Sequence, residues 1–124
     1  MKIKLLKSKI HRATVTEADL HYVGSITIDE ELMEASGIIE YEKVHILDIT
    51  NGSRLDTYAI KGLRGSGCIK INGAAAHHVN VNDLIIIVSY GQLENHEIKS
   101  HKPQIVHVNS QNKITSIYHD EFSV

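Results

Sequence analysis

The chain has 124 residues, 42% of them hydrophobic and 23% charged, and its formal net charge is -2. Length and composition are those of one globular domain with its own hydrophobic core, and they exclude a disordered chain. The charge balance lacks the basic excess by which proteins bind the phosphates of nucleic acids. We therefore expect a single domain over residues 1–124 with no nucleic-acid partner.

Cysteine content and hydropathy indicate the compartment. The single cysteine, Cys68, excludes an internal disulfide and fits a reducing environment. The longest apolar run, residues 84–88, is too short to cross a bilayer, and the basic N-terminus lacks the apolar segment of a signal peptide. We expect a cytoplasmic protein that does not insert into a membrane.

The first predicted elements are a strand and a short helix. Residues 2–15 alternate imperfectly between apolar and polar side chains, which favours an extended or bent strand. Residues 29–37 favour a helix, because the Asp29 carboxylate can accept hydrogen bonds from the free amides at its start. Acidic residues follow in the first turn, where they stabilise the helix dipole, and Gly37 can adopt the left-handed conformation that ends a helix.

A β-hairpin and further strands are predicted next. Residues 44–49 and 54–60 flank Asn51-Gly52, a dipeptide typical of tight hairpin turns. Residues 68–71 read as another strand, and the unbroken apolar run 84–88 predicts a strand buried on both faces.

The last predicted strand, residues 104–108, follows the only proline, Pro103. Polarity rises after it, so the tail after about residue 109 is expected to be poorly ordered. Six or seven short strands with close turns and one or two small helices favour a mainly β fold, a small closed barrel over a sandwich.

Two features could carry chemistry but also have ordinary structural interpretations. The loop from Asn72 to Ala76 has small side chains and a glycine, which suit either close approach of an anion to the backbone or a tight turn. On the strand 54–60, Arg54, Asp56 and Tyr58 share one face, where they could hold and protonate a small carboxylate or simply face solvent. The nine histidines are scattered without the spacing of a metal site, so no metal is expected.

The most specific signal is the string His21-Tyr22-Val23-Gly24-Ser25-Ile26-Thr27-Ile28-Asp29. Together with residues 9–12 and 16–20, it closely resembles the pyruvoyl-dependent L-aspartate 1-decarboxylases. Further matching strings follow in order at residues 50–54, 57–60, 64–66 and 71–77. The resemblance runs from about Lys9 to Val88 and fades beyond Tyr90.

The resemblance implies that the precursor cuts its own chain between Gly24 and Ser25, into residues 1–24 and 25–124. Ser25 would become a covalent pyruvoyl group, which replaces pyridoxal phosphate by forming a Schiff base with the substrate amine. Thr57, with Asn72 nearby, would hydrogen-bond the Gly24 oxygen during cleavage. Tyr58 corresponds to the proton donor of the family.

The implied reaction is decarboxylation of L-aspartate to β-alanine and CO2, which supplies a precursor of pantothenate. Arg54 is the best candidate to clamp a substrate carboxylate. Thr57 and the backbone of Gly73, Ala74 and Ala75 correspond to the substrate-binding residues of the family. Further contributions are expected from Lys9, His11 and Asn72.

The resemblance also implies a six-stranded double-psi β-barrel that assembles as a homotetramer with active sites between subunits. Some relatives need a maturation protein for efficient cleavage. Two alternatives remain: a non-catalytic barrel that binds small anions at residues 72–76, and an oligomerising scaffold. The presence of Ser25, Thr57 and Tyr58 together favours the enzyme, because a simple binding protein has no need for all three.

Overall fold

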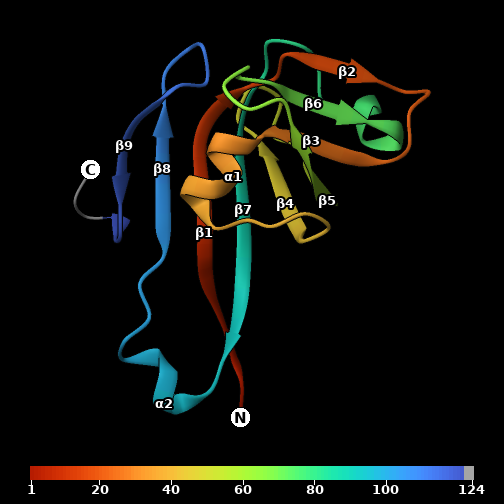
Figure 1. Cartoon of the computed structure of the whole chain (residues 1–124). Helices are drawn as coiled ribbons and strands as arrows, with labels where there is room; N and C mark the ends of the chain where they lie inside the picture. The colour runs from red at the N-terminus through yellow and green to blue at the C-terminus, as the bar shows by residue number, and fades with distance from the viewer. Residues whose placement is uncertain (122–124) are drawn as a thin grey trace.

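The computed structural model describes residues 1–121, and about half of this part of the chain is in β-strands, which are joined by short helices and turns (Figure 1). The strands in this part are β1 (Ile3–Thr14), β2 (Glu17–Asp19), β3 (Ser25–Asp29), β4 (Lys43–Asp48), β5 (Arg54–Gly62), β6 (Ile69–Asn72), β7 (Leu84–Leu93), β8 (Gln104–Val108) and β9 (Ile114–Tyr118). The helices are α1 (Glu30–Ser36), the 3-10 helix η1 (Gly73–His77) and α2 (Asn95–Ile98).

The sheet closes into a barrel through the N-terminal strands. Neighbouring strands pair in the order β2-β6-β3-β5-β4-β7-β1-β8-β9. β1 and β2 follow each other along the chain, yet β1 pairs with β7 while β2 pairs with β6 at the far end of this order. Between them, the amide of Thr16 donates a hydrogen bond of 2.9 Å to the carbonyl of Ile69. Strands β1/β2, β3, β4, β5, β6 and β7 therefore form a closed ring of six.

The prediction of a mainly β barrel with short helices is thus confirmed. The sheet is mixed, with three parallel pairs (β3 with β5, β2 with β6, β1 with β8) among antiparallel ones, which agrees with the double-psi class. None of the helices within residues 1–121 is long and apolar enough to cross a membrane.

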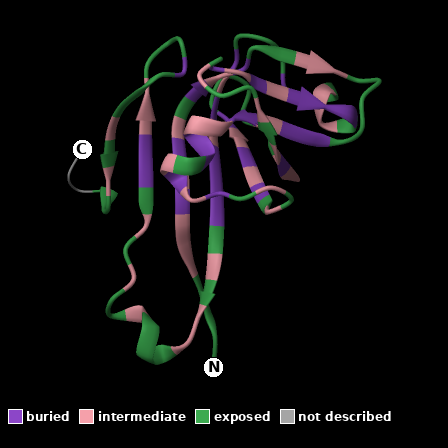
Figure 2. Cartoon of the chain, viewed as in Figure 1, coloured by how far each residue is buried: buried purple, intermediate pink, exposed green. Residues whose placement is uncertain are grey.

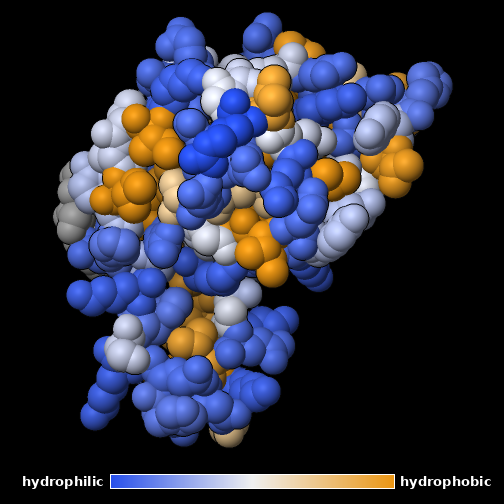
Figure 3. Space-filling view, in the orientation of Figure 1, coloured by the Kyte–Doolittle hydropathy of each residue, from blue (hydrophilic) through white to orange (hydrophobic). Residues whose placement is uncertain are grey.

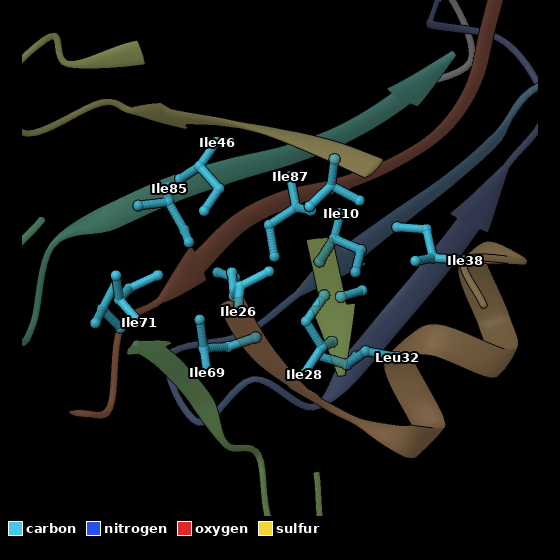
Figure 4. Close-up of a cluster of buried hydrophobic side chains, with 14 of the residues drawn as sticks. Ile10, Ile26, Ile28, Leu32, Ile38, Ile46, Ile69, Ile71, Ile85 and Ile87 are labelled. Atoms are coloured by element: carbon cyan, nitrogen blue, oxygen red, sulfur yellow. The ribbon is translucent and has the colours of Figure 1, made fainter. Parts of the chain in front are cut away.

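The barrel interior is filled largely by isoleucine. Eight isoleucine side chains from five strands have no exposed surface and converge inside the ring (Figure 4): Ile10, Ile26, Ile28, Ile46, Ile69, Ile71, Ile85 and Ile87. Leu32 of α1 closes one side of this cluster. Branched side chains suit the pleated surface of strands, and their burial supplies the main driving force for folding.

β1 bends at two irregularities, which determine which of its side chains point out of the barrel. Its register with β7 shifts between Leu6 and Ser8 and again between Ile10 and Ala13, and Arg12 has a φ of 62°. Such bulges bend a strand. Ile10 points into the core, whereas the side chains of Lys9 and His11 lie on the outer face beside β8.

The predicted helix is confirmed, with the cap that the sequence indicated. Asp29 Oδ1 accepts a hydrogen bond from the amide of Glu31, and Gly37 ends α1 with a φ of 78°. The same carboxylate accepts hydrogen bonds from the amides of Gly65 and Gly67 at 3.0 and 2.7 Å. Burial alone would raise the pKa of Asp29, but these backbone hydrogen bonds lower it below its usual value.

Two expectations from the sequence differ from the structure. The tail after residue 109 was expected to be poorly ordered, yet Ile114–Tyr118 pair with β8 as β9. Asn112 explains this order, because its buried side chain bonds to the backbone of Thr14 and Gly67. Residues 122–124 of the tail lie outside the described residues. The run 84–88 is not buried on both faces, since Leu84 and Ile86 are half-buried whereas Ile85 and Ile87 are buried. Figure 2 shows the burial class of the residues along each strand.

A pair of buried carboxyl groups lies where β4 ends and β7 begins. Asp48 is only 3% exposed, and its Oδ1 accepts hydrogen bonds from the amides of Thr50 and Asn51. Its Oδ2 is buried without a donor among residues 1–121, and it faces Asp83. Burial, together with the Asp83 carboxylate, raises the pKa of Asp48 from 3.8 to about 6.

The raised pKa makes stability depend on pH. Between pH 3.8 and about 6 the folded chain binds a proton that the unfolded chain has lost, so the free energy of unfolding falls as pH rises through this window. Asp48→Asn keeps the acceptor for both amides and offers a permanent donor to Asp83. We expect the variant to be more stable than the wild type by about 1–3 kcal/mol at pH 8, with a smaller difference at pH 4. Urea unfolding at both values measures this, and equal differences at the two pH values would contradict it.

Candidate active site

The proposed nucleophile, Ser25, is a buried hydroxyl fixed by an asparagine. Ser25 is the first residue of β3, has no exposed surface, and pairs with Asn72 of β6 in an antiparallel register. The Asn72 side-chain amide donates to Ser25 Oγ at 2.8 Å and to Thr27 Oγ1 at 3.0 Å. Both hydrogens of the amide are therefore used, and the serine oxygen is fixed beside the Gly24–Ser25 peptide bond.

Polar atoms around Ser25 leave hydrogen-bonding capacity for chemistry. Ser25 Oγ lies 3.4 Å from the carbonyl oxygen of Val23, which can accept its proton in a long hydrogen bond. Asn72 Oδ1 is buried and has no hydrogen-bond partner among the described residues. An unpaired buried acceptor costs free energy, and such atoms are often found at functional sites.

Gly73 is the residue that packs tightly against the proposed cleavage point. It has a φ of 71°, and a Cβ on it would lie 2.7 Å from the Cα of Gly24 and 3.0 Å from the carbonyl oxygen of Tyr22. A Cβ on Gly24 would meet no atom within 4 Å. The close packing at this point therefore requires a glycine at position 73 and leaves space at position 24.

Tyr58 and Thr57 lie on β5, the parallel neighbour of β3. Ile26 pairs with Ala59 in this register. Continued by one and two residues, the register brings Tyr58 beside Ser25 and Thr57 beside the scissile glycine. The hydrogen bonds of residues 1–121 include none between Thr57 and Gly24, so the structure does not itself supply the expected oxyanion contact.

The remaining predicted residues near Ser25 are more exposed. Arg54 is exposed at the first position of β5. Asp56, which shares its face, is engaged from β4 by His45 at 2.7 Å and by Lys43 at 3.5 Å. Ala74 and Ala75 follow Gly73 in η1, Ala74 exposed and Ala75 half-buried.

Lys9 and His11 lie in a separate pocket of about 240 Å³, which Ile105, His107 and Glu121 also line. Lys9 Nζ is 3.0 Å from a carboxylate oxygen of Glu121. Burial lowers the pKa of His11, and the positive charge of Lys9 and neighbouring His107 add to this effect. Neither Ser25 nor any residue that hydrogen-bonds to it lines this pocket, so within one chain Lys9 and Ser25 belong to separate sites.

Sequence analysis missed three residues at these sites: Thr27, His107 and Glu121. Thr27 could have been found from two-residue periodicity, since it lies on the same face of β3 as Ser25. His107 and Glu121 belong to β8 and to the segment after β9, and no local pattern connects them with β1. Elsewhere, a hollow of about 440 Å³ between α1 and residues 38–40 contains none of the predicted site residues.

Two further observations concern the surface and the grouping of possible metal ligands in the described part of the chain. On the face shown in Figure 3, hydrophobic residues form small groups separated by hydrophilic ones. Within residues 1–121, no three His, Cys, Asp or Glu side chains are grouped so that they could hold a metal ion.

Comparison with known proteins gives consistent matches. The family model for aspartate decarboxylase matches residues 1–115, and thus extends past Tyr90, where the resemblance was expected to fade. The chain is 60% identical to aspartate 1-decarboxylase of Caldicellulosiruptor saccharolyticus, covering 98% of this chain and 94% of the relative. The enzyme of that name from Acetivibrio thermocellus is also 60% identical, with 98% and 96% covered. A crystal structure of the computationally designed protein msDPBB_sym2 is a distant structural neighbour (TM-score 0.42, 18% identity, covering 68% of this chain and 96% of the designed one).

The contact between Gly73 and Gly24 predicts a strong effect of one added methyl group. Gly73→Ala combines an unfavourable positive φ with displacement of the backbone at Gly24, so we expect a loss of about 1–3 kcal/mol in unfolding free energy. Gly91→Ala is the matched control, since its Cβ would make ordinary contacts of 3.6 and 3.8 Å with Leu93 and Lys7. It should change stability by no more than about 0.5 kcal/mol. Equal effects in denaturant unfolding would refute the close packing at Gly73.

Proposed function

This chain belongs to the aspartate decarboxylase family, and we propose that it converts L-aspartate into β-alanine and CO2 with a pyruvoyl group made from its own Ser25. The observation that carries the proposal is the buried Ser25 hydroxyl, held at 2.8 Å by Asn72 beside the Gly24 peptide. A non-catalytic barrel that binds anions has no use for a buried serine held in this way. In the uncut chain, the side of Gly73 on which a Cβ would lie is filled by the backbone of Gly24, so an anion cannot approach Gly73 from that side.

The first step is an acyl shift within the precursor. Ser25 Oγ attacks the carbonyl carbon of Gly24 and gives up its proton, the C–N bond breaks, and the Ser25 nitrogen gains a proton as an ester forms. Asn72 holds Oγ for this attack, and before the attack the Ser25 hydroxyl donates a long hydrogen bond to the carbonyl of Val23. Thr57, beside Gly24 in the strand register, is the proposed donor to the developing negative charge on the Gly24 oxygen.

The next steps divide the chain. Loss of the α-proton of Ser25 expels the Gly24 carboxylate and leaves a dehydroalanine at position 25. Addition of water and loss of ammonia then convert this residue into the pyruvoyl group. The products are residues 1–24, ending in a carboxylate, and residues 25–124, carrying the new group at their start.

The residues around position 25 fit a pyruvoyl group. The site is buried, Gly73 contributes no side chain, and the amide of Asn72 offers donors as well as an unpaired acceptor. Asn72 would hold the group from one side and the backbone of η1 from the other. The pyruvoyl carbonyl supplies the electron acceptor that loss of CO2 requires.

Side chains of this chain then bind the substrate and move a proton. We assign Arg54 to one substrate carboxylate, because a guanidinium binds carboxylates with two parallel hydrogen bonds. Thr57 and the backbone of Gly73, Ala74 and Ala75 line the site. Tyr58, beside Ser25 in the strand register, donates the proton that replaces CO2 on the α-carbon.

A complete site requires more than one copy of the chain. Lys9 and His11 are assigned to the substrate, yet they line a pocket that does not include Ser25 of the same chain. A second copy that brings its β1 to the first copy's β3 would unite the two groups of residues. We therefore propose a homo-oligomer, a tetramer, with its sites between subunits.

Replacement of Ser25 tests the cleavage. Ser25→Ala has no hydroxyl to attack and should remain one intact, inactive chain, whereas the wild type should give two fragments that meet at Gly24/Ser25. Ser110→Ala, at an exposed serine, is the control and should be cut like the wild type. Denaturing intact mass distinguishes these results. Cleavage of Ser25→Ala would refute the acyl shift, wild-type cleavage only in cell extract would identify a maturation protein, and an intact wild type in both would favour the anion-binding barrel.

Replacement of Tyr58 tests the proton donor separately from cleavage. Tyr58→Phe should still be cut but should lose turnover by roughly 10²–10⁴-fold, because only the phenolic proton is missing. Tyr41→Phe is the matched control, since its ring lies 6.3 Å from that of Tyr58 and is largely exposed. Near-normal formation of β-alanine by Tyr58→Phe would remove this residue from the proposed role.

A further inference from the structure

The pocket around Lys9 is closed by the C-terminal part of the chain. β8 and β9 run beside β1 on the outside of the barrel (Figure 1), and the segment after β9 brings Glu121 to Lys9. The Lys9 side chain is 18% exposed, and its ammonium group lies 3.0 Å from the Glu121 carboxylate. The pocket thus contains a cation that is already bound to a carboxylate of its own chain.

Lys9 is the main positive charge of the pocket, because the other basic group beside it, His11, favours its neutral form. Burial and the nearby positive charges favour the neutral form of His11, and its Nδ1 is buried without a partner among residues 1–121. The ring of His107 lies 5.1 Å from that of His11 and 5.1 Å from that of Tyr118, which fixes the wall of the pocket. Glu121 is the only carboxylate among the residues that line it.

We propose that Glu121 is an internal carboxylate that competes with the substrate carboxylate for Lys9, so that the C-terminal segment sets the apparent affinity for aspartate. This inference rests on the proposed function, which assigns Lys9 to substrate binding. The two competitors offer the same chemical group to the same ammonium. Glu121 is 53% exposed and can therefore swing into solvent when substrate enters.

The size of the effect follows from occupancy. A ligand that needs a free Lys9 binds with its intrinsic affinity multiplied by the fraction of time for which Lys9 is free. β9 is paired with β8, so it tethers Glu121 at a high local concentration. Loss of a partly exposed ion pair such as this one should change the apparent affinity about three- to fivefold. Salt screens the ion pair, so the change should be smaller at high salt.

Steady-state kinetics of the cut enzyme give the first test. Glu121→Gln should lower KM for L-aspartate about three- to fivefold at low salt, with the change confined to KM and reduced at high salt. Glu121→Asp retains the charge and should keep KM closer to that of the wild type. Glu34→Gln is the matched control. It removes an exposed carboxylate of α1 that pairs with Arg64, and it should leave KM unchanged. An unchanged or higher KM for Glu121→Gln would overturn the proposal.

Binding without turnover gives an independent test. Succinate carries the two carboxylates of aspartate without its amine, and its binding to the uncut Ser25→Ala protein can be measured by calorimetry. Glu121→Gln in that background should tighten succinate binding about three- to fivefold, and the gain should vanish when Lys9→Gln is also present. An equal gain with and without Lys9 would overturn the competition. A wild type that makes no β-alanine would instead refute the proposed function, and the succinate result would still decide the role of Glu121.

Discussion

The hydrogen bonds of one buried side chain, Asn72, connect the barrel to the site. Asn72 ends β6, and β6 lies between β2 and β3, so strand pairing fixes its backbone on both sides. Its amide then holds Ser25 and Thr27 on the neighbouring strand. Without the pairing of β2 with β6, which closes the ring, the amide would have no fixed position from which to orient the serine.

Two other buried polar side chains hold the connections between elements. Asp29 joins the start of α1 to the loop at Gly65 and Gly67, and Asn112 joins the same loop to Thr14 and to the C-terminal strands. Each forms several hydrogen bonds, as buried polar groups must to offset the loss of water. The C-terminal segment that carries Glu121 therefore extends from an anchored strand.

Features determined by neighbouring residues could be predicted from the sequence. The hairpin at Asn51-Gly52 and the capped helix after Asp29 are both present. β3 was missed as a strand although residues 25–29 alternate between polar and apolar side chains, because the segment has only five residues and leads directly into the helix cap at Asp29. The contacts of Asn112 were missed because they join residues 45 and 98 positions apart.

In the candidate site too, local sequence strings could be interpreted, whereas features that depend on strand pairing could not. The string around Gly24 and Ser25 identified the family, but the role of Thr27 depends on the register of β3 with β6. The residue that packs most closely against Gly24 is Gly73, which is distant from it in sequence. Lys9 lies in a pocket apart from Ser25 because of which strands become neighbours, and composition and periodicity do not determine this.

Closure of the barrel by β1 and β2 has a consequence for a chain cut after Gly24. The shorter product would consist mainly of these two strands, so the ring would then be completed by a separate peptide held through backbone pairing with β6, β7 and β8. Before the cut, reassembly after unfolding is an intramolecular event; afterwards two molecules must meet, and stability depends on protein concentration. Folding must therefore precede cleavage, and the mature protein would behave as a naturally split one.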